Sequence, residues 1–267
     1  MKNSIALIIA GSDTCSGAGM QADLKTFTVH NIYASTVLTA LTAQNTMGVN
    51  EVFNIPSNFI EAQIKALAQD FDISFIKIGM LSNVEIIETV DNCLSKYLSD
   101  IPIVLDPVMI AKGGHTLIEE NAIDYLIKKL LPKCFLLTPN IPEAEKILNC
   151  ELTSIYKVEE NIKNFHDLGV KNILLKGGHL KSDDNFLVDT LCQNKKISKF
   201  YSKFINTENT HGTGCSLASA ITSNLMKKQG LNESVKNAQK FVYESIKNGF
   251  VIGAGHNPIN HLHKYNK

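Results

Sequence analysis

The sequence predicts an α/β fold with a central, mostly parallel β-sheet that is covered by helices on both faces. Short and nearly continuous apolar runs such as "IALIIAG" alternate with longer segments whose apolar residues recur at helical spacing, such as "NFIEAQIKALAQDF". Strands without polar alternation are buried on both faces, which is typical of parallel sheets. The chain has no internal repeat and no linker rich in Pro, Gly or Ser, so we predict a single domain over residues 1–267.

Local signals define the predicted elements along the chain. Pro132 stops one predicted helix, Gly169 ends another, and Asp106 with Pro107 closes a short apolar strand. Residues 185–206 carry alternating or aromatic β patterns around a polar "QNKK" turn, which predicts a small hairpin extension at the sheet edge. The other predicted strands are residues 5–11, part of 33–46, 74–80, 102–109, 134–140 and 172–178, and the predicted helices are 17–31, 58–71, 83–98, 121–132, 141–148, 159–169, 214–228 and 233–250.

Composition and charge narrow the function classes. The 26 Lys and Arg residues balance the 26 Asp and Glu residues, Trp is absent, and aromatic residues make up only 7% of the chain. The sequence therefore has neither the basic footprint nor the stacking residues of a nucleic-acid-binding protein. The apolar run in "MKNSIALIIAGSD" ends at Gly11, too early for a secretory signal, and no stretch reaches transmembrane length, so we expect no membrane partner.

The six cysteines are scattered along the chain without a CxxC pair or nearby histidine ligands. This distribution argues against a zinc site and against the disulfide scaffold of a small secreted protein. We expect most of them to be reduced thiols, and we predict a cytoplasmic protein.

A glycine-rich turn, "HGTGCS", leads into the predicted helix 214–228. The N–H groups of Gly212 to Cys215 would point at an anion there, the helix dipole would favour its negative charge, and glycine lets the backbone approach closely. An ordinary glycine-rich helix start explains the motif equally well. The motif alone leaves an anion site and a plain helix start open.

Other polar residues follow predicted strands, at the edge where open α/β sheets bind ligands. Lys176 ends an apolar strand and precedes two glycines, which favours a phosphate ligand over a solvated lysine. Asn140 and Glu143, three positions apart, either orient the waters of Mg²⁺ or form a helix capping box. Asp106 belongs either to a strand-end turn or to an active site. The clustering of such residues indicates a site more strongly than any one motif does.

Two common nucleotide-binding patterns are missing from the sequence. No GxxxxGK[ST] motif occurs, and "GSDTCSGAG" is neither a GxGxxG fingerprint nor followed by an acidic residue about twenty positions on. A dinucleotide-dependent oxidoreductase is therefore disfavoured.

The ordered motifs resemble the hydroxymethylpyrimidine/phosphomethylpyrimidine kinases of thiamine biosynthesis, a family with the ribokinase-like fold. They are "AGSD…SGAGMQADLKTF", "LTAQNTMGV", "KIGML", "DPVMIAKGG", "TPNIPEAE", "LLKGGH" and "NTHGTGCSLASAI". The likeness runs from Ile5 to about Gly255. It implies ATP- and Mg²⁺-dependent phosphorylation of 4-amino-5-hydroxymethyl-2-methylpyrimidine, then of its monophosphate to the diphosphate. It also implies a homodimer, because homodimers are common in the family.

The resemblance assigns the residues on the substrate side. Gln44 matches the residue that contacts the pyrimidine edge, and an amide suits this role because it offers both a donor and an acceptor. Asp23, together with backbone near Gly11, matches another substrate contact. Met80 and Val108 match pocket walls, although such side chains are more often part of a core.

The resemblance also assigns the phosphate side. Asn140 and Glu143 match the magnesium motif, and "AKGGH" matches a mobile flap in which Lys112 contacts phosphate or is solvated. The residues that we assign to phosphate binding and catalysis are Asp106, Lys112, Lys176, Gly212, Thr213, Gly214 and Cys215.

Cysteine at position 215 is typical of the pyrimidine kinase branch, whereas aspartate is usual in the wider superfamily. A helix N-terminus lowers the pKa of a thiol, so we expect some thiolate near neutral pH. Our hypothesis is that Cys215 accepts or positions the hydroxymethyl proton; the alternative is that it only fills space. The first loop departs from the family pattern at Thr14 and Cys15, and we interpret Cys15 as a tolerated loop residue.

Two other functions remain open at this point. A pyridoxal kinase shares the fold and the anion-binding turn, but its flap resembles a type with a second cysteine, whereas this flap has Ala111 in "VMIAKGG". A catalytically inactive ligand-binding protein on the same fold is disfavoured, because Lys176, Asn140 and Glu143 are all present.

Overall fold

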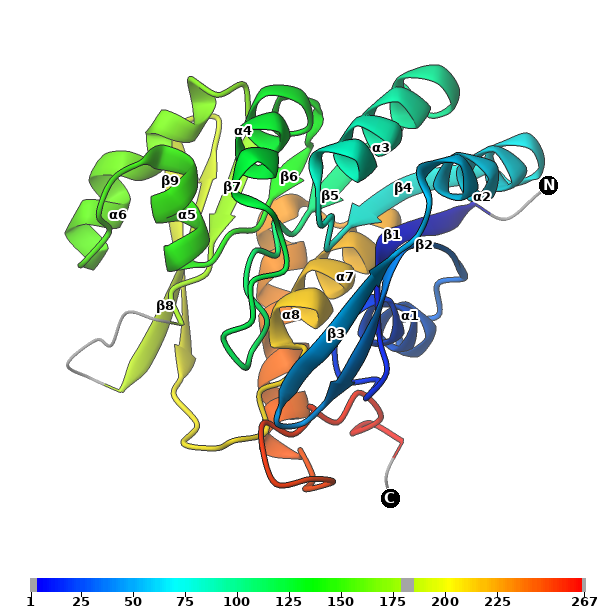
Figure 1. Ribbon diagram of the computed structural model, residues 1–267. Coiled ribbons are helices and arrows are strands. Elements are labelled where there is room, and N and C mark those ends of the chain that lie inside the picture. Colours follow the sequence, from blue (N-terminus) through cyan, green and yellow to red (C-terminus); the bar gives the residue numbers. More distant parts are fainter. Residues whose placement is uncertain (1–3, 179–184, 266–267) are drawn as a thin grey trace.

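The computed structural model describes residues 4–178 and 185–265, and within them nine strands form one sheet in the order β3-β2-β1-β4-β5-β6-β7-β8-β9 (Figure 1). The ends of the predicted domain and His179, the last residue of the "LLKGGH" motif, lie outside the described residues. The strands are β1 (Ile5–Asp13), β2 (Ala34–Asn45), β3 (Gly48–Asn54), β4 (Ile73–Ile78), β5 (Ile103–Leu105), β6 (Leu136–Leu137), β7 (Asn172–Leu175), β8 (Phe186–Gln193) and β9 (Lys196–Lys203).

The centre of the sheet is parallel, as the apolar strands predict. β2, β1, β4, β5, β6 and β7 pair in parallel in that spatial order. β3 pairs antiparallel with β2 at one edge, and β8 and β9 continue antiparallel from β7 at the other edge. The predicted fold class, including the hairpin at residues 185–206, is confirmed.

Helices cover both faces of the sheet. One core cluster packs α2, α3, α4, α5 and α6 against one face, while α1, α7 and α8 cover the other face in two further clusters. The side chains of β1 show this division, because Leu7 and Ile9 belong to the first cluster and Ala6 and Ile8 to the opposite one. The helices are α1 (Gly19–Val29), α2 (Ser57–Asp70), α3 (Val84–Tyr97), α4 (Glu120–Lys129), η1 (Leu131–Lys133), α5 (Ile141–Leu148), α6 (Ile155–Asn161), η2 (Ile162–His166), α7 (Thr213–Met226) and α8 (Leu231–Lys247).

Two elements differ from the prediction. The strand β3 was not predicted, because its side chains are exposed or only half-buried and no apolar face marks it. The single helix predicted at residues 159–169 is two shorter elements, α6 and the 3₁₀-helix η2. Gly169 still ends this region, with a φ of +83° that favours glycine. None of the helices in the described ranges is long and apolar enough to cross a membrane.

Candidate active site

A cavity of about 820 Å³ lies where the carboxyl ends of the central strands meet the start of α7. This is the edge at which open α/β sheets bind ligands. The cavity brings together all the predicted site residues except Asp23, although they come from distant parts of the sequence. Those that line it are Gly11, Gln44, Met80, Asp106, Val108, Lys112, Asn140, Glu143, Lys176, Gly212, Thr213, Gly214 and Cys215.

At the start of α7, the backbone of Gly212 lies very close to the backbone of the first loop. Gly212 has a φ of +83°, and a Cβ added there would lie 1.8 Å from the carbonyl oxygen of Gly17. Glycine is therefore the residue that this turn accepts. The Thr213 N–H donates to the Thr210 carbonyl oxygen at 3.4 Å, whereas Gly214 and Cys215, the next residues of the first helical turn, have no backbone acceptor within the helix. Their N–H groups are therefore available to bind an anion in the cavity.

A buried ion pair lies beside this helix start. Lys176 Nζ is 2.6 Å from Asp106 Oδ1, and a Cβ added to Gly214 would lie 3.2 Å from the same nitrogen. Burial would lower the pKa of Lys176, but the carboxylates of Asp106 and Glu143 raise it above its usual value. The ammonium group is therefore charged, and it faces the turn that can hold a phosphate.

Asn140 and Glu143 form a complete capping box at the start of α5. The Glu143 N–H donates to Asn140 Oδ1 at 2.9 Å, and the Asn140 N–H donates to Glu143 Oε2 at 2.8 Å. Burial raises the pKa of Glu143 to about 7; Lys176 acts against this shift and Asp106 adds to it. The two residues thus have the capping role, one of the two alternatives that the sequence left open, and the Mg²⁺ role stays a prediction.

This donor set fits Mg²⁺. Carboxylate oxygens are preferred ligands of Mg²⁺, and Asp106 and Glu143 both line the cavity. The side-chain oxygen of Asn140 accepts the capping hydrogen bond, so Asn140 contributes chiefly by fixing the position of Glu143.

The thiol of Cys215 is buried and protonated, so the prediction of thiolate near neutral pH is wrong. Burial raises its pKa to about 12; Lys77 acts against the shift, Asp23 and Asp106 add to it, and the N–H of Gly19 also acts against it. The desolvation of the sulfur outweighs the helix N-terminus on which the prediction depended.

The structure corrects the placement of Asp23. Its carboxylate is fully buried, lies 2.7 Å from Lys77 Nζ, and accepts a hydrogen bond from Ser219 Oγ at 2.8 Å. Lys77, not Asp23, lines the cavity. The sequence analysis missed Lys77, although a lysine inside the apolar run "SFIKIGM" was an available signal.

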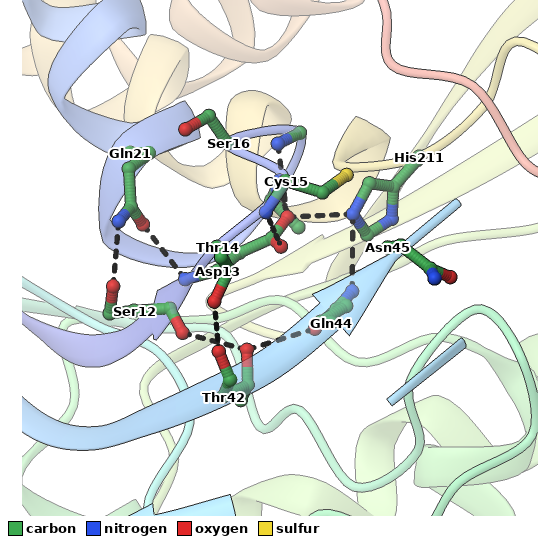
Figure 2. Close-up of polar contacts among 12 residues, drawn as sticks. Ser12, Asp13, Thr14, Cys15, Ser16, Gln21, Thr42, Gln44, Asn45 and His211 are labelled. Carbon is green, nitrogen blue, oxygen red and sulfur yellow. Dashed lines mark hydrogen bonds and ion pairs between the residues drawn. The ribbon is translucent and has the colours of Figure 1, made fainter. Parts of the chain in front are cut away.

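Asp13 organises the first loop and was also missed (Figure 2). Its carboxylate accepts N–H groups from Cys15 at 2.9 Å, Gly17 at 3.0 Å and Ala18 at 2.7 Å. His211 Nε2 lies 2.7 Å from the same carboxylate. Asp13, Cys15 and His211 each place one potential metal ligand within 4.8 Å of the others. The Asp13 carboxylate, however, already accepts hydrogen bonds from Cys15, Gly17, Ala18 and His211, so a metal ion is not needed to satisfy it.

Gln44 comes from the end of β2 and faces His211 and Thr42 (Figure 2). One end of its amide is 3.3 Å from His211 Nε2, and the other end is 3.2 Å from Thr42 Oγ1. Gln44 therefore lines the cavity while His211 and Thr42 contact the two ends of its amide.

Met80 lies close to Gly11 on the wall of the same cavity, because a Cβ added to Gly11 would lie 2.9 Å from the Met80 sulfur.

The flap predicted at residues 111–115 borders the cavity through Ala111, Lys112 and Gly114. It is a short loop closed by a bridge between Ile110 and Thr116. A Cβ added to Gly113 would lie 3.1 Å from the Cα of Gly48, so the loop approaches the turn between β2 and β3.

Residues 13–260 match the family described as Phosphomethylpyrimidine kinase. The chain belongs to this family. It is 43% identical over 260 residues to a hydroxymethylpyrimidine/phosphomethylpyrimidine kinase of Haemophilus influenzae, and the match covers 96% of this chain and 95% of that protein. It is 42% identical to a thiamine biosynthesis bifunctional protein of Geobacter sulfurreducens, of which it spans 52%.

Solved structures show the same architecture. The ADP complex of a pyridoxal kinase of Bacillus subtilis is 32% identical, with a TM-score of 0.90 and 99% of each chain covered. A phosphomethylpyrimidine kinase of Clostridium difficile is 38% identical, with a TM-score of 0.80 over 91% of this chain and 100% of that one. The ribokinase-like fold and a kinase function therefore agree with the family membership.

Proposed function

We propose that the protein transfers the γ-phosphoryl group of ATP to the hydroxymethyl oxygen of 4-amino-5-hydroxymethyl-2-methylpyrimidine, and a second phosphoryl group to the resulting monophosphate, in thiamine diphosphate biosynthesis. The observation that supports this best is one cavity that holds both the Gln44 amide and the start of α7 with Lys176. An amide matches the donor and acceptor of an aminopyrimidine edge, and a helix start with a lysine matches a phosphoryl group.

In this proposal the start of α7, Lys176 and Cys215 have different roles in phosphoryl transfer. The N–H groups at the start of α7, chiefly those of Gly214 and Cys215, bind the transferring group, and Lys176 contributes a positive charge beside it. The neutral thiol of Cys215 positions the hydroxymethyl group. As the hydroxymethyl oxygen bonds to the γ-phosphorus and the bond to ADP breaks, the hydroxyl proton passes to an oxygen of the transferred phosphoryl group.

ATP and Mg²⁺ belong to the proposal. When bound, Mg²⁺ neutralises phosphate charge, and Asp106 and Glu143 are the residues that would hold it, directly or through water. The capping box keeps the Glu143 carboxylate in place for this role.

A product assay tests the function. The protein is incubated with ATP, Mg²⁺ and the aminopyrimidine, and mass spectrometry follows the addition of one and two phosphoryl groups. We expect both products and ADP, with the rate reduced by about tenfold or more in Lys176→Gln because its charge is lost. The absence of any phosphorylated pyrimidine would overturn the proposal and favour a ligand-binding protein.

Pyridoxal is the competing substrate, because pyridoxal kinases are among the similar structures. The flap has Ala111 where the type with a pair of cysteines carries the second thiol, so we expect a higher kcat/KM for the pyrimidine than for pyridoxal. A higher kcat/KM for pyridoxal would reverse the assignment.

A cytoplasmic location and a homodimer complete the proposal. Both stay predictions, and light scattering of the purified protein measures the oligomeric state.

A further inference from the structure

We propose that His211, held by Asp13, fixes the direction of the Gln44 amide and thereby the order in which the cavity presents its acceptor and donor to the pyrimidine. This inference rests on the proposed function, in which Gln44 contacts the pyrimidine edge. It assigns His211 and Asp13 as positioning residues that determine specificity.

The His211 ring has a fixed place. Its backbone N–H donates to the Asn257 carbonyl oxygen at 3.0 Å, and a parallel bridge joins His211 to Pro258. The ring packs against Gly17 so closely that a Cβ added there would lie 2.2 Å from its Cδ2 atom. The side chain is only 6% exposed. The ring is therefore confined between the first loop and the C-terminal segment.

The nitrogen that faces Asp13 carries a proton. Burial would raise the pKa of Asp13, but the hydrogen bonds from His211 and from the N–H groups of Ala18 and Cys15 hold it below its usual value. The carboxylate is therefore ionised and can only accept. His211 Nε2, 2.7 Å away, must donate to it. Nε2 carries this proton in both the neutral ring and the charged ring.

The same nitrogen lies 3.3 Å from one end of the Gln44 amide. In the orientation drawn in Figure 2 the amide nitrogen faces Nε2, so two N–H donors meet. A half-turn of the amide places the carbonyl oxygen there instead, where it shares the Nε2 proton with Asp13. The oxygen and nitrogen of an amide are assigned from their hydrogen-bond partners, and here the partners favour the carbonyl beside His211.

Thr42 supports the same orientation from the other end of the amide. Its single hydroxyl proton has two candidate acceptors, the Ser12 carbonyl oxygen at 2.9 Å and, in the orientation drawn, the Gln44 carbonyl oxygen at 3.2 Å. Donation to the nearer one, Ser12, leaves Oγ1 as an acceptor toward Gln44. The amide end at 3.2 Å from Oγ1 is then the NH₂ group of Gln44. With the carbonyl at His211 and the NH₂ at Thr42, no two donors in this network face each other, and one N–H of Gln44 is left for a ligand.

A fixed amide selects one order of polar groups in the ligand. The Gln44 carbonyl oxygen accepts on the His211 side, and its second N–H donates on the Thr42 side. A 4-aminopyrimidine presents an amino donor next to the ring-nitrogen acceptor, so its amino group lies on the His211 side. A 4-oxo pyrimidine presents the reverse order, with a carbonyl acceptor next to a ring N–H donor, and it meets a mismatch at both positions.

The experiment compares kcat/KM for the 4-amino and 4-oxo forms of the 5-hydroxymethyl-2-methylpyrimidine in wild type, His211→Leu and His211→Gln. We expect wild type to prefer the amino form by about a thousandfold or more, because a mismatched buried amide leaves polar groups unpaired. Without a donor at position 211 the amide can turn its NH₂ to Asp13, so His211→Leu narrows this preference by about tenfold or more. His211→Gln places an N–H near the Nε2 position and retains the preference.

Thr42→Val is a second route to the same readout, because it removes the acceptor at the other end of the amide and keeps the shape of the side chain. It also narrows the preference, even if His211→Leu does not fold. If the variants lose activity toward both pyrimidines equally and keep the preference of wild type, His211 and Thr42 have only a structural role. That result overturns the inference about the Gln44 amide and leaves the proposed function intact. If wild type phosphorylates neither pyrimidine, the proposed function itself is overturned.

Discussion

Burial decides the protonation state of Cys215 in this cavity, whereas charged neighbours and hydrogen bonds decide those of Lys176 and Asp13. Cys215 lies at the start of α7, where a helix dipole would favour thiolate, yet the loss of water around the sulfur raises its pKa to about 12. A protonated thiol can still donate a hydrogen bond to a substrate hydroxyl or to a phosphoryl oxygen. We therefore propose that Cys215 is a polar positioning group beside the backbone N–H groups, and not a pre-formed base.

Replacement of Cys215 tests this role. We expect Cys215→Ala to lower kcat by about tenfold or more, and Cys215→Ser to retain more activity because its hydroxyl also donates. Because the thiol pKa lies far above neutrality, kcat in wild type should show no step from thiol ionisation between about pH 6 and pH 9. Steady-state kinetics across this range provides the measurement. A loss of less than about threefold in Cys215→Ala, with KM unchanged, would mean that the side chain only fills space.

Sequence patterns identify residues that follow strands more readily than residues inside them. Lys176 follows an apolar run and was predicted, whereas Lys77 interrupts one and was read as part of the strand. His211 was missed because its role depends on Asp13, a partner 198 positions away in the chain. A single sequence does not contain that contact, so only the fold reveals it.

At the scale of elements, the helix α5 shows how a capping motif and apolar spacing together predict the bounds of a helix. Its predicted bounds agree with the observed Ile141–Leu148, because the capping signal and the apolar spacing coincide there. By contrast β3 has few buried side chains, and its pairing with β2 depends on tertiary contacts that no local pattern predicts. Apolar spacing is the stronger signal of the two, because α2 and α8 were predicted although no side chain caps their first turn.

The capping box gives a prediction for α5. We expect Asn140→Ala to lower the free energy of unfolding by about 1 kcal/mol, because it removes the acceptor for the Glu143 N–H. Asn140→Asp keeps an acceptor and serves as the matched control. Urea denaturation followed by circular dichroism measures both variants, and equal stability of Asn140→Ala and wild type would show that the cap contributes nothing.

At the scale of the whole molecule, one buried ion pair connects the sheet to both helices beside the cavity. Lys77 belongs to β4, Asp23 to α1, and Ser219 of α7 donates to the second oxygen of Asp23. Burial would lower the pKa of Lys77, but the Asp23 carboxylate raises it above its usual value, so the lysine is charged. The pair fixes how α1 and α7 lie against the sheet, and therefore where the first loop meets the glycine-rich turn at the start of α7.

This pair yields the last prediction, which concerns stability alone because Lys77 also lines the cavity. Lys77→Met leaves the Asp23 carboxylate buried without its counter-ion, so we expect it to lower the free energy of unfolding by about 3–5 kcal/mol. In the double variant Lys77→Met/Asp23→Asn the buried charge is absent, while Ser219 keeps a hydrogen-bond acceptor. The double variant should therefore be more stable than Lys77→Met, with the two changes strongly non-additive. Urea denaturation of the wild type, both single variants and the double variant completes the cycle. Additive losses would contradict a direct interaction between the two charges, and the join between β4, α1 and α7 would then depend on apolar packing alone.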